Sequence, residues 1–252
     1  MKKITLTALS FTVFLLTYAQ QKQGKVSYEH TMPIKLTADM PAALLPMMPT
    51  SKIEKYEMLF GNSQLLWKQI QDSIEDESIS GKITNMIFQA SPFGPDFAKY
   101  INFKTSKEVD QIDLLKKKFI VDDSITKFKW NITQEAKIIL NRQCIKATTT
   151  QVTTHVRLSI TDGSMMDKEI TDTLEVVAWF APDIPVPAGP DGFNGLPGLI
   201  LELIIGNGKQ VYIAKEITGE ANLALIKEPS GGKHYTQEEY KKEFNKLMQD
   251  QR

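Results

Sequence analysis

The 252-residue sequence contains a single cysteine, Cys144, so the chain has no second thiol with which to form an internal disulfide. Cys144 lies in a segment rich in aliphatic residues, and we interpret it as a small apolar core residue rather than a nucleophile. No cysteine occurs near the N-terminus to carry the lipid of a lipoprotein. A disulfide-stapled fold and a lipid anchor are therefore both disfavoured.

The motifs of common enzymes are missing as well. The three histidines, His30, His155 and His234, lie in no recognisable catalytic or zinc-binding motif, and no Gly-x-Ser-x-Gly elbow or phosphate-binding glycine loop is present. The sequence therefore predicts neither a cofactor nor a catalytic residue, and we expect a non-enzymatic protein. A hydrolase that works through carboxylates needs no such motif and stays as an alternative.

Net charge is also absent, because 30 lysines and arginines balance 30 aspartates and glutamates. A protein that binds nucleic acid generally uses an excess of positive charge to displace the counterions of the phosphate backbone. This balanced composition offers no such field to a polyanion. We therefore expect no nucleic-acid partner.

The N-terminus has the pattern of a secretory signal peptide. Lys2 and Lys3 precede an apolar run at residues 6–16, which is shorter than the ~20 residues that span a bilayer. Ala19 completes a small-residue cleavage pattern, so we place the signal peptide at residues 1–19. We expect an exported protein with no transmembrane segment in the mature chain. The periplasm is the expected compartment, and secretion or association with the outer membrane are the alternatives.

Residues 20–230 show the short alternating segments of a single β-rich domain. Two such segments flank Gly61-Asn62-Ser63, which predicts a hairpin. The stretch Lys127–Ile132 places its aromatic and β-branched residues on one face, which predicts a strand. The expected fold is mainly β: a strongly curved antiparallel meander, half-open and barrel-like, with a C-terminal helix.

Residues 231–252 change from the two-residue period to helical spacing. Tyr240, Phe244 and Leu247 recur every three or four residues, and Thr236 with Glu239 forms a capping box. We expect a helix that docks on the sheet. The proline and glycines before it make a loosely attached tail the alternative.

The most informative segment joins a proline-rich loop to an apolar strand. Four prolines between Pro182 and Pro190 predict an extended connection, and a Gly-Leu-Pro-Gly turn follows it. From Leu199 to Ile205 both faces of the pattern are apolar except for Glu202, which predicts a buried central strand that a Gly-Asn-Gly hairpin then ends. We interpret Glu202 as the ion-pair partner of a lysine or arginine on a neighbouring strand. An acid–base or ligand-binding role is the alternative.

The residues of this turn spell GLPGLI, and the chain resembles the GLPGLI family that is named after the hexapeptide. The resemblance extends upstream, to residues 141–147 and to the signal peptide, and it implies an exported protein of Gram-negative bacteria without an assigned activity. A structural corner is the favoured role of the motif, and a preorganised recognition loop is the alternative. The candidate binding region of motif loop and strand comprises Trp179, Pro185, Gly195, Leu196, Pro197, Gly198, Leu199, Ile200 and Glu202.

A second candidate region concentrates methionine, proline and aliphatic residues between Met32 and Pro49. It can form an apolar flap over a cavity or against a partner, with an ordinary packed loop as the alternative. The flap residues are Met40, Leu44, Leu45, Met47 and Met48. Thioether sulfurs near His30, including that of Met32, can alternatively bind Cu(I), because soft ligands select soft ions.

The expected function is therefore that of an exported cell-envelope protein with a non-enzymatic binding role. Its expected partner is an apolar small molecule or another envelope protein, such as one of the outer membrane. A copper-binding envelope protein and a carboxylate-dependent hydrolase are the alternatives.

Overall fold

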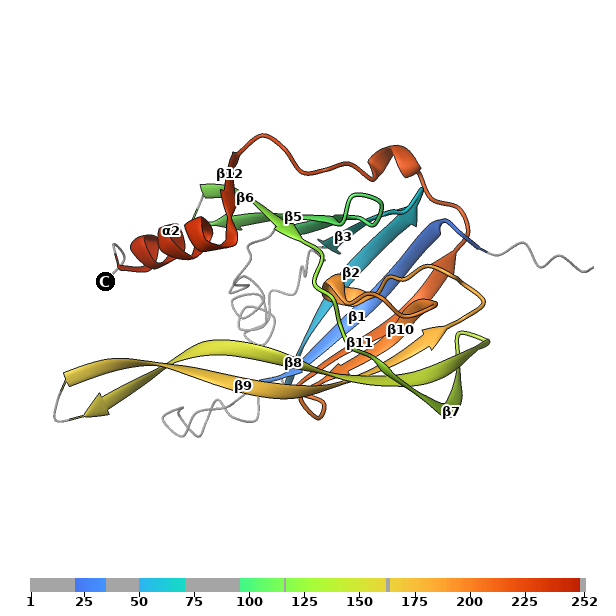
Figure 1. Cartoon of the computed structure of the whole chain (residues 1–252), viewed down its shortest axis with the longest axis horizontal. Coiled ribbons are helices and arrows are strands. Elements are labelled where there is room, and N and C mark those ends of the chain that lie inside the picture. Colours follow the sequence, from blue (N-terminus) through green and yellow to red (C-terminus); the bar gives the residue numbers. More distant parts are fainter. Residues whose placement is uncertain (1–20, 35–49, 71–95, 116, 162–163, 250–252) are drawn as a thin grey trace, which may run out of the picture.

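The computed structural model describes residues 21–34, 50–70, 96–115, 117–161 and 164–249. Within these residues the chain forms one twelve-stranded sheet and a C-terminal helix, α2 (Gln237–Gln249), as Figure 1 shows. The expected mainly β fold is therefore confirmed. In chain order, the strands are β1 (Gly24–Pro33), β2 (Ser51–Gly61), β3 (Gln64–Ile70), β4 (Ala98–Asn102), β5 (Lys107–Leu114), β6 (Lys117–Ser124), β7 (Asn131–Ile139), β8 (Arg142–Thr161), β9 (Ser164–Ala181), β10 (Leu199–Ile205), β11 (Gln210–Thr218) and β12 (Lys233–Thr236).

The sheet consists of two antiparallel meanders that lie side by side, in the order β12-β6-β5-β4-β3-β2-β1-β11-β10-β9-β8-β7. The two halves meet where β1 pairs with β11. The edge strands β12 and β7 do not pair with each other, so the sheet curves without closing into a barrel. Only β12, which is parallel to β6, departs from the antiparallel pattern among the described strands. This arrangement confirms the half-open meander.

The connection from β6 to β7 spans the open side, because these strands lie at opposite ends of the sheet. Residues 125–130, which we call the strap, make this crossing without forming a strand. The strand predicted at Lys127–Ile132 is therefore wrong over most of its length. The side chains of the strap nevertheless alternate between packed and exposed positions. Phe128 and Trp130 pack against the core, while Lys127 and Lys129 are exposed. Any extended chain with one packed face shows this period, whether or not a strand pairs with it.

The two predicted hairpin turns are confirmed, and left-handed backbone angles explain their residues. Asn62 and Ser63, with φ of 52° and 62°, join β2 to β3. Asn207, with φ of 56°, joins β10 to β11 between two glycines. The buried central strand predicted from Leu199 to Ile205 is β10, which pairs with β9 on one side and β11 on the other.

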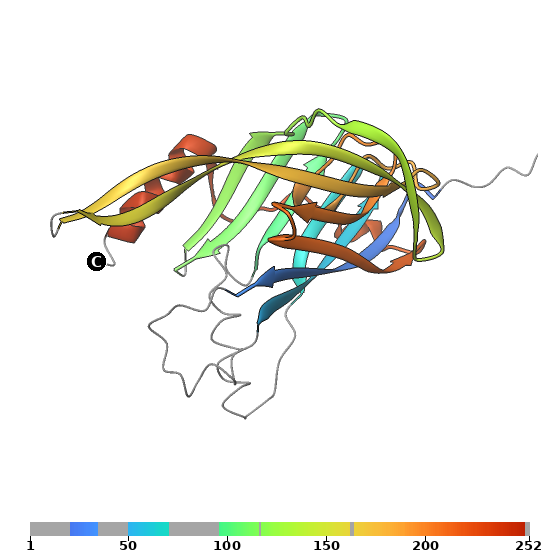
Figure 2. The same ribbon diagram turned by 90° about the horizontal axis from the view of Figure 1, so that it is seen from below.

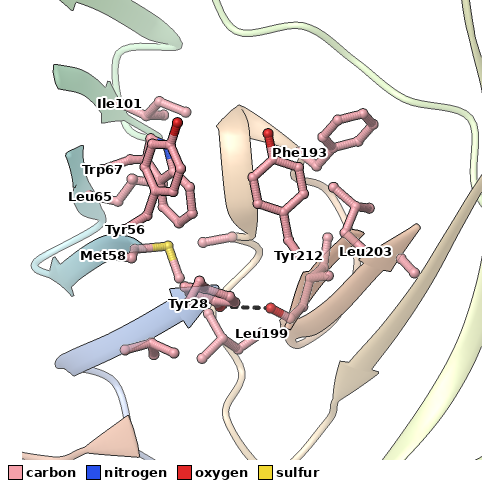
Figure 3. Close-up of a cluster of buried hydrophobic side chains, with 14 of the residues drawn as sticks. Tyr28, Tyr56, Met58, Leu65, Trp67, Ile101, Phe193, Leu199, Leu203 and Tyr212 are labelled. Atoms are coloured by element: carbon pink, nitrogen blue, oxygen red, sulfur yellow. Dashed lines mark hydrogen bonds between the residues drawn. The ribbon is translucent and has the colours of Figure 1, made fainter. Parts of the chain in front are cut away.

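The main hydrophobic core lies on the inner face of the curved sheet, where side chains from both halves meet (Figure 3). Tyr28, Tyr56 and Trp67 come from the first half, and Leu203 and Tyr212 come from the second. Trp67 is 1% exposed and stacks on Tyr56 with a centroid separation of 4.7 Å. Large aromatic side chains bury roughly 150–250 Å² each, so this cluster contributes much of the stability that joins the two halves.

The connection from β11 to β12 covers part of the outer face. Leu59, Val109 and Ile120 point outward from β2, β5 and β6, and Ile226 of this connection packs on them. The chain thereby reaches the far edge of the sheet, where β12 adds beside β6. Part of the outer face is thus buried, which gives the first half of the sheet two apolar faces.

Helix α2 begins with the predicted capping box, which is confirmed. The Thr236 backbone N–H donates to Glu239 Oε2 at 2.8 Å, and the Glu239 N–H donates to Thr236 Oγ1 at 3.3 Å. The Tyr240 ring lies 5.3 Å from that of Phe119 on β6, so the helix docks on the sheet as expected. Among the described helices, none combines the length and the hydropathy that crossing a membrane requires.

β8 and β9 extend beyond the rest of the sheet as a long two-stranded arm (Figure 2). β7 pairs with β8 only as far as Thr148, and β10 pairs with β9 only as far as Val176. From there to Thr161 and Ser164 the two strands pair with each other. In the part of the chain that the structure describes, each strand of the arm therefore has one free edge.

Candidate functional site

The proline- and glycine-rich loop at residues 182–198 folds onto the inner face of the sheet. The Leu199 N–H donates to the carbonyl of Ile184 at 3.0 Å, so the loop is bonded to the start of β10. From the other half of the sheet, the Tyr28 hydroxyl donates to the carbonyl of Ile200 at 2.7 Å (Figure 3). The loop therefore occupies space that the curved sheet would otherwise leave open.

The GLPGLI hexapeptide has a structural role in this arrangement. Gly198 lies so close to β9 that a Cβ atom on it would be 2.4 Å from the carbonyl oxygen of Ala181. Leu196, Leu199 and Ile200 are at most 1% exposed. The motif thus seats the loop against the central strand, and this geometry favours the structural interpretation over the recognition loop. The remaining loop members of the candidate region are half-buried or exposed: Pro185, Gly195 and Pro197.

The strap lies on this loop and is fixed to it through Asn194. Trp130 Nε1 donates to the Asn194 carbonyl at 2.8 Å, and Asn194 Nδ2 donates to the carbonyl of Thr126 at 3.1 Å. Between these anchors, Phe128 stacks on Phe193 with a centroid separation of 4.6 Å. The path of the strap is therefore set by the loop rather than by a neighbouring strand.

A cleft of about 590 Å³ opens where the strap diverges from β8. Pairing between β7 and β8 stops at Thr148, and residues 149–152 of β8 line one wall. Residues 126–129 of the strap line the other wall. Asp191–Phe193 of the loop, with Lys99 and Glu108 of β4 and β5, complete the lining. The cleft thus lies at the seam along which the half-open barrel fails to close.

The floor of the cleft is an ion cluster around Lys99, which is 7% exposed. The Lys99 ammonium pairs with Glu108 and also with Asp110, the latter at 3.0 Å. Burial by itself lowers the pKa of Lys99, but Asp110 and Glu108 outweigh it, so the pKa lies well above its usual value. In turn, burial raises the pKa values of Glu108 and Asp110 against the opposing effect of Lys99.

Asp191 adds a third carboxylate to this cluster. It lies in the short 3-10 turn η2 (Pro190–Gly192) with φ of 53° and ψ of 28°, a left-handed conformation that aspartate tolerates better than most residues. Burial raises the pKa of Asp191, and Lys99 opposes this effect. Lys99 thus pairs with two carboxylates and interacts electrostatically with a third. A half-buried carboxyl with a raised pKa and an unusual backbone conformation, in a cleft, marks a candidate functional site.

Much of the rest of the lining is also polar, and Phe128, Val152 and Phe193 are its apolar members. Lys127 and Lys129 are exposed on the strap, and Thr149 and Gln151 supply neutral hydrogen-bonding groups from β8. A hydrocarbon would have to displace water from all of these groups without replacing their hydrogen bonds. The described lining is therefore suited to a polar ligand that carries hydrogen-bonding or charged groups.

A second buried polar cluster surrounds Glu54 of β2. Glu54 accepts a hydrogen bond from the Tyr56 hydroxyl at 2.9 Å, pairs with Lys52 at 2.8 Å and lies 3.3 Å from Nδ1 of His30. Burial alone would raise the pKa of Glu54, but the bonds from His30, Lys52 and Tyr56 lower it to about 2. The His30 ring also stacks flat on that of Tyr212, with centroids 3.9 Å apart. This cluster has the contacts of a packed core.

The alternative copper site at His30 and Met32 stays a prediction for the described part of the chain. No three histidine, cysteine, aspartate or glutamate side chains there are grouped to hold a metal ion. Met32 is half-buried on the same strand as His30. The flap predictions fall outside the described residues and stay predictions, and they concern Met40, Leu44, Leu45, Met47 and Met48.

Glu202 lies on the outer face of the sheet, away from the cleft. Lys137 of β7 reaches across two strands to it, with Nζ 2.7 Å from the carboxylate. The same ammonium lies over the Trp179 ring, 4.3 Å from its centroid. This is the ion pair expected for Glu202, although its partner is not on an adjacent strand. The structure therefore does not bring Glu202 or Trp179 together with the cleft residues.

Reasoning from the sequence missed the polar residues of the cleft floor, Lys99, Glu108 and Asp191. The one local signal was Pro190-Asp191-Gly192, a turn sequence that predicts a special backbone conformation at the aspartate. Nothing around Lys99 or Glu108 distinguishes them from ordinary strand residues. Their role depends on burial, which only the folded chain reveals.

Residues 130–202 match a family described as "Protein of unknown function (Porph_ging)". This span holds the end of the strap, the arm, Asp191 and the hexapeptide. No curated protein matches the chain.

Two solved structures resemble the chain, both of PNGF-II, at 15% sequence identity. In space group P21 the TM-score is 0.50 over 88% of this chain and 32% of that chain. In space group C2 it is 0.49 over 85% and 31%. The chain thus spans about a third of the length of the protein it resembles, and the likeness concerns the fold alone.

Proposed function

We propose that this chain is an exported cell-envelope protein that binds a polar ligand, without transforming it, in the cleft between the strap and β8. The observation that carries this proposal is the Asp191 carboxyl, which lines the cleft at a floor where Lys99 already pairs with two other carboxylates. Burying an excess of one charge is costly unless another group compensates it. A ligand that supplies the compensating group would gain affinity from it.

The described lining supports a polar ligand in place of the apolar one expected from the sequence. The apolar side chains of the inner face, Trp67 among them, are packed on one another and are not available to a ligand. The cleft walls instead present hydroxyl, amide and ammonium groups. An apolar ligand held by the predicted flap between Met32 and Pro49 is the alternative outcome of the test below.

Export and membership of the GLPGLI family belong to the same proposal. Export is supported by the pattern at residues 1–19, and membership by the hexapeptide, which lies inside the matched span 130–202. Expression of the full chain in a Gram-negative bacterium should yield a periplasmic protein whose N-terminus is Gln20. An uncleaved precursor confined to the cytoplasm would contradict export.

Ligand binding can be tested by NMR on the isotope-labelled mature protein. We expect amides at residues 126–129, 149–152 and 191–193 to shift with at least one member of a panel of amines, guanidines, carboxylates and sugars. Thr149→Trp, which fills the cleft, should abolish those shifts. The matched control Thr171→Trp, on the exposed part of β9, should retain them. Shifts that persist in Thr149→Trp, or an apolar dye as the sole ligand, would count against a polar cleft.

A carboxylate-dependent hydrolase is the second candidate, and one observation favours it. Glu108 and Asp191 line the same cleft, and burial raises both of their pKa values. A carboxyl that stays protonated closer to neutral pH can act as a general acid. The test is turnover of chromogenic peptide and glycoside substrates by the wild type and by Asp191→Asn. Activity that Asp191→Asn abolishes would replace the binding proposal, and no turnover would exclude hydrolysis of those substrates.

A further inference from the structure

We propose that the ligand of the cleft is an extended peptide segment that adds as a β-strand to the free edge of β8 and places a basic side chain at the floor. This inference rests on the proposed function, because it names the ligand class of the same cleft. It commits to a peptide because the cleft wall is a strand edge, and to a basic side chain because of the charges at the floor.

The free edge begins where β7 leaves β8. The last paired residues are Asn131 and Thr148, whereas β8 continues to Thr161 with β9 as its neighbour on the other side. In an antiparallel strand every second residue directs its N–H and C=O groups to the same edge. Within the described residues, the backbone groups on this edge beyond Thr148 have no protein partner. A row of unpaired donors and acceptors is a template for another strand.

The strap keeps this edge from being covered by the protein's own chain. Residues 127–130 directly precede β7 and would pair with residues 149–152 if β7 continued backward in register. Instead, the bonds of Asn194 to Trp130 and Thr126 hold these residues on the loop. The result is a wedge with a strand edge on one wall, and the cleft of about 590 Å³ occupies the place of the missing strand.

The floor selects the charge of the incoming side chain. At the floor, Glu108 and Asp110 pair with the Lys99 ammonium and Asp191 acts on it electrostatically, so three carboxylates face one buried ammonium. Lys127 and Lys129 also line the cleft, but they are exposed on the strap wall. The side chains of a strand alternate between its two faces, so every second residue of an added strand would face the floor. A lysine or arginine at such a position would compensate the excess through charge-assisted hydrogen bonds.

The arm has a second free edge, on β9 before Val176, but it supports no comparable inference. That edge lies outside the lining of the described cleft, to which β8 contributes and β9 does not. The wall formed by residues 149–152 is distinguished by having the ion cluster beside it.

The test uses seven-residue peptides of alternating threonine and valine whose central residue is arginine, threonine or glutamate. We expect the arginine peptide to bind the mature protein most tightly and the glutamate peptide most weakly. A copy of the arginine peptide, N-methylated on the amides of one edge, loses at least two backbone bonds and should bind about tenfold more weakly. Hydrogen exchange at alternate amides of residues 149–154 should slow when the arginine peptide is bound.

A charge variant then tests the floor. Asp191→Asn should lower the affinity for the arginine peptide by about tenfold, which corresponds to the loss of one charge-assisted hydrogen bond. The affinity for the threonine peptide should not change. The control Glu216→Gln removes an exposed carboxylate of β11 and should change neither. Equal binding of the N-methylated peptide, unchanged exchange along β8, or equal loss for the arginine and threonine peptides would overturn the inference.

The two proposals fail in different ways. If amines, guanidines or sugars shift the cleft amides but no peptide binds there, strand addition is wrong and the polar-ligand function stands. If no polar fragment and no peptide reaches the cleft, the proposed function itself is wrong. Thr149→Trp should abolish peptide binding, and binding that survives in this variant would place the peptide elsewhere and overturn the inference.

Discussion

Two carboxylates near the same loop, Glu202 on the outer face and Asp191 on the inner face, have opposite surroundings. The Glu202 carboxylate has an ammonium of its own at 2.7 Å, and the Trp179 ring stabilises that ammonium from the other side. Asp191 instead interacts electrostatically with Lys99, whose ammonium already pairs with Glu108 and Asp110. A half-buried acid with a dedicated partner has its charge compensated by the fold. An acid that shares a partner leaves charge to be compensated by something else.

The comparison also shows why the more conspicuous acid in the sequence is the less informative one. Glu202 stands out because aliphatic residues flank it, yet alternation along β10 puts its carboxylate on the opposite face from Leu203. Asp191 is inconspicuous among prolines and glycines, yet its turn carries it into the cleft. The residues that flank an acid in the sequence do not show which groups surround it, because those depend on the face of the sheet on which its side chain lies.

The largest expected loss of stability comes from replacing Lys99, and it should exceed the loss from replacing Lys137, the partner of Glu202. Lys99→Met removes the ammonium that pairs with Glu108 and Asp110, and we expect it to lower the free energy of unfolding by about 3–5 kcal/mol at pH 7. Lys137→Met breaks a half-exposed pair on the outer face and should cost less than about 1 kcal/mol. Urea denaturation monitored by circular dichroism measures both. Equal losses would contradict the distinction between the two regions.

The loss of unfolding free energy caused by Lys99→Met should become smaller as the pH falls. Without the ammonium, the pKa values of the buried carboxylates in the folded protein rise further above their unfolded values. Groups of this kind destabilise the folded state at neutral pH, and the penalty disappears as the pH falls and they become protonated. We therefore expect the difference between Lys99→Met and the wild type to be smaller at pH 4 than at pH 7, and a constant difference would argue against the ion cluster.

A third carboxylate, Glu54, is buried and shows what a fully compensated acid contributes to stability. Its pKa is lowered to about 2 from 4.5, so its stabilisation is present above about pH 4.5 and is lost as the pH falls toward 2. At 1.36 kcal/mol for each pKa unit, the loss amounts to about 3 kcal/mol. Glu54→Gln should flatten the stability profile between these pH values. The control Glu57→Gln, on the outer face of the same strand, should keep the slope.

Much of the fold could be predicted because its turns and caps are local. Asn62 and Asn207 occupy left-handed positions that few other residues tolerate, and Thr236 with Glu239 caps the helix within four residues. The two apolar faces of β10 followed from alternation and a buried central position. Each of these features is determined by residues that are close in the sequence and does not depend on distant parts of the chain.

The cleft could not be predicted, because it depends on where two segments stop pairing. Phe128 and Trp130 alternate with lysines in the same way whether the strap pairs with β8 or packs on the loop. Side-chain bonds to Asn194, some sixty residues away in sequence, decide between these two arrangements. The floor likewise combines β4, β5 and the loop, which only the sheet order brings together.

The smallest expected changes in stability are those of Asp191→Asn and Glu202→Gln, and they have opposite signs. Asp191→Asn removes a carboxylate that is costly to bury, and we expect it to raise the free energy of unfolding by about 1 kcal/mol at pH 7. The gain should vanish on acidification, because a carboxyl with a raised pKa becomes protonated in the wild type as the pH falls. Glu202→Gln loses its bond to Lys137 and should cost up to about 1 kcal/mol. Paired urea titrations at pH 7 and pH 4 measure both signs. A loss for Asp191→Asn would mean that the fold already compensates Asp191, and the cleft would then have no excess charge to offer a ligand.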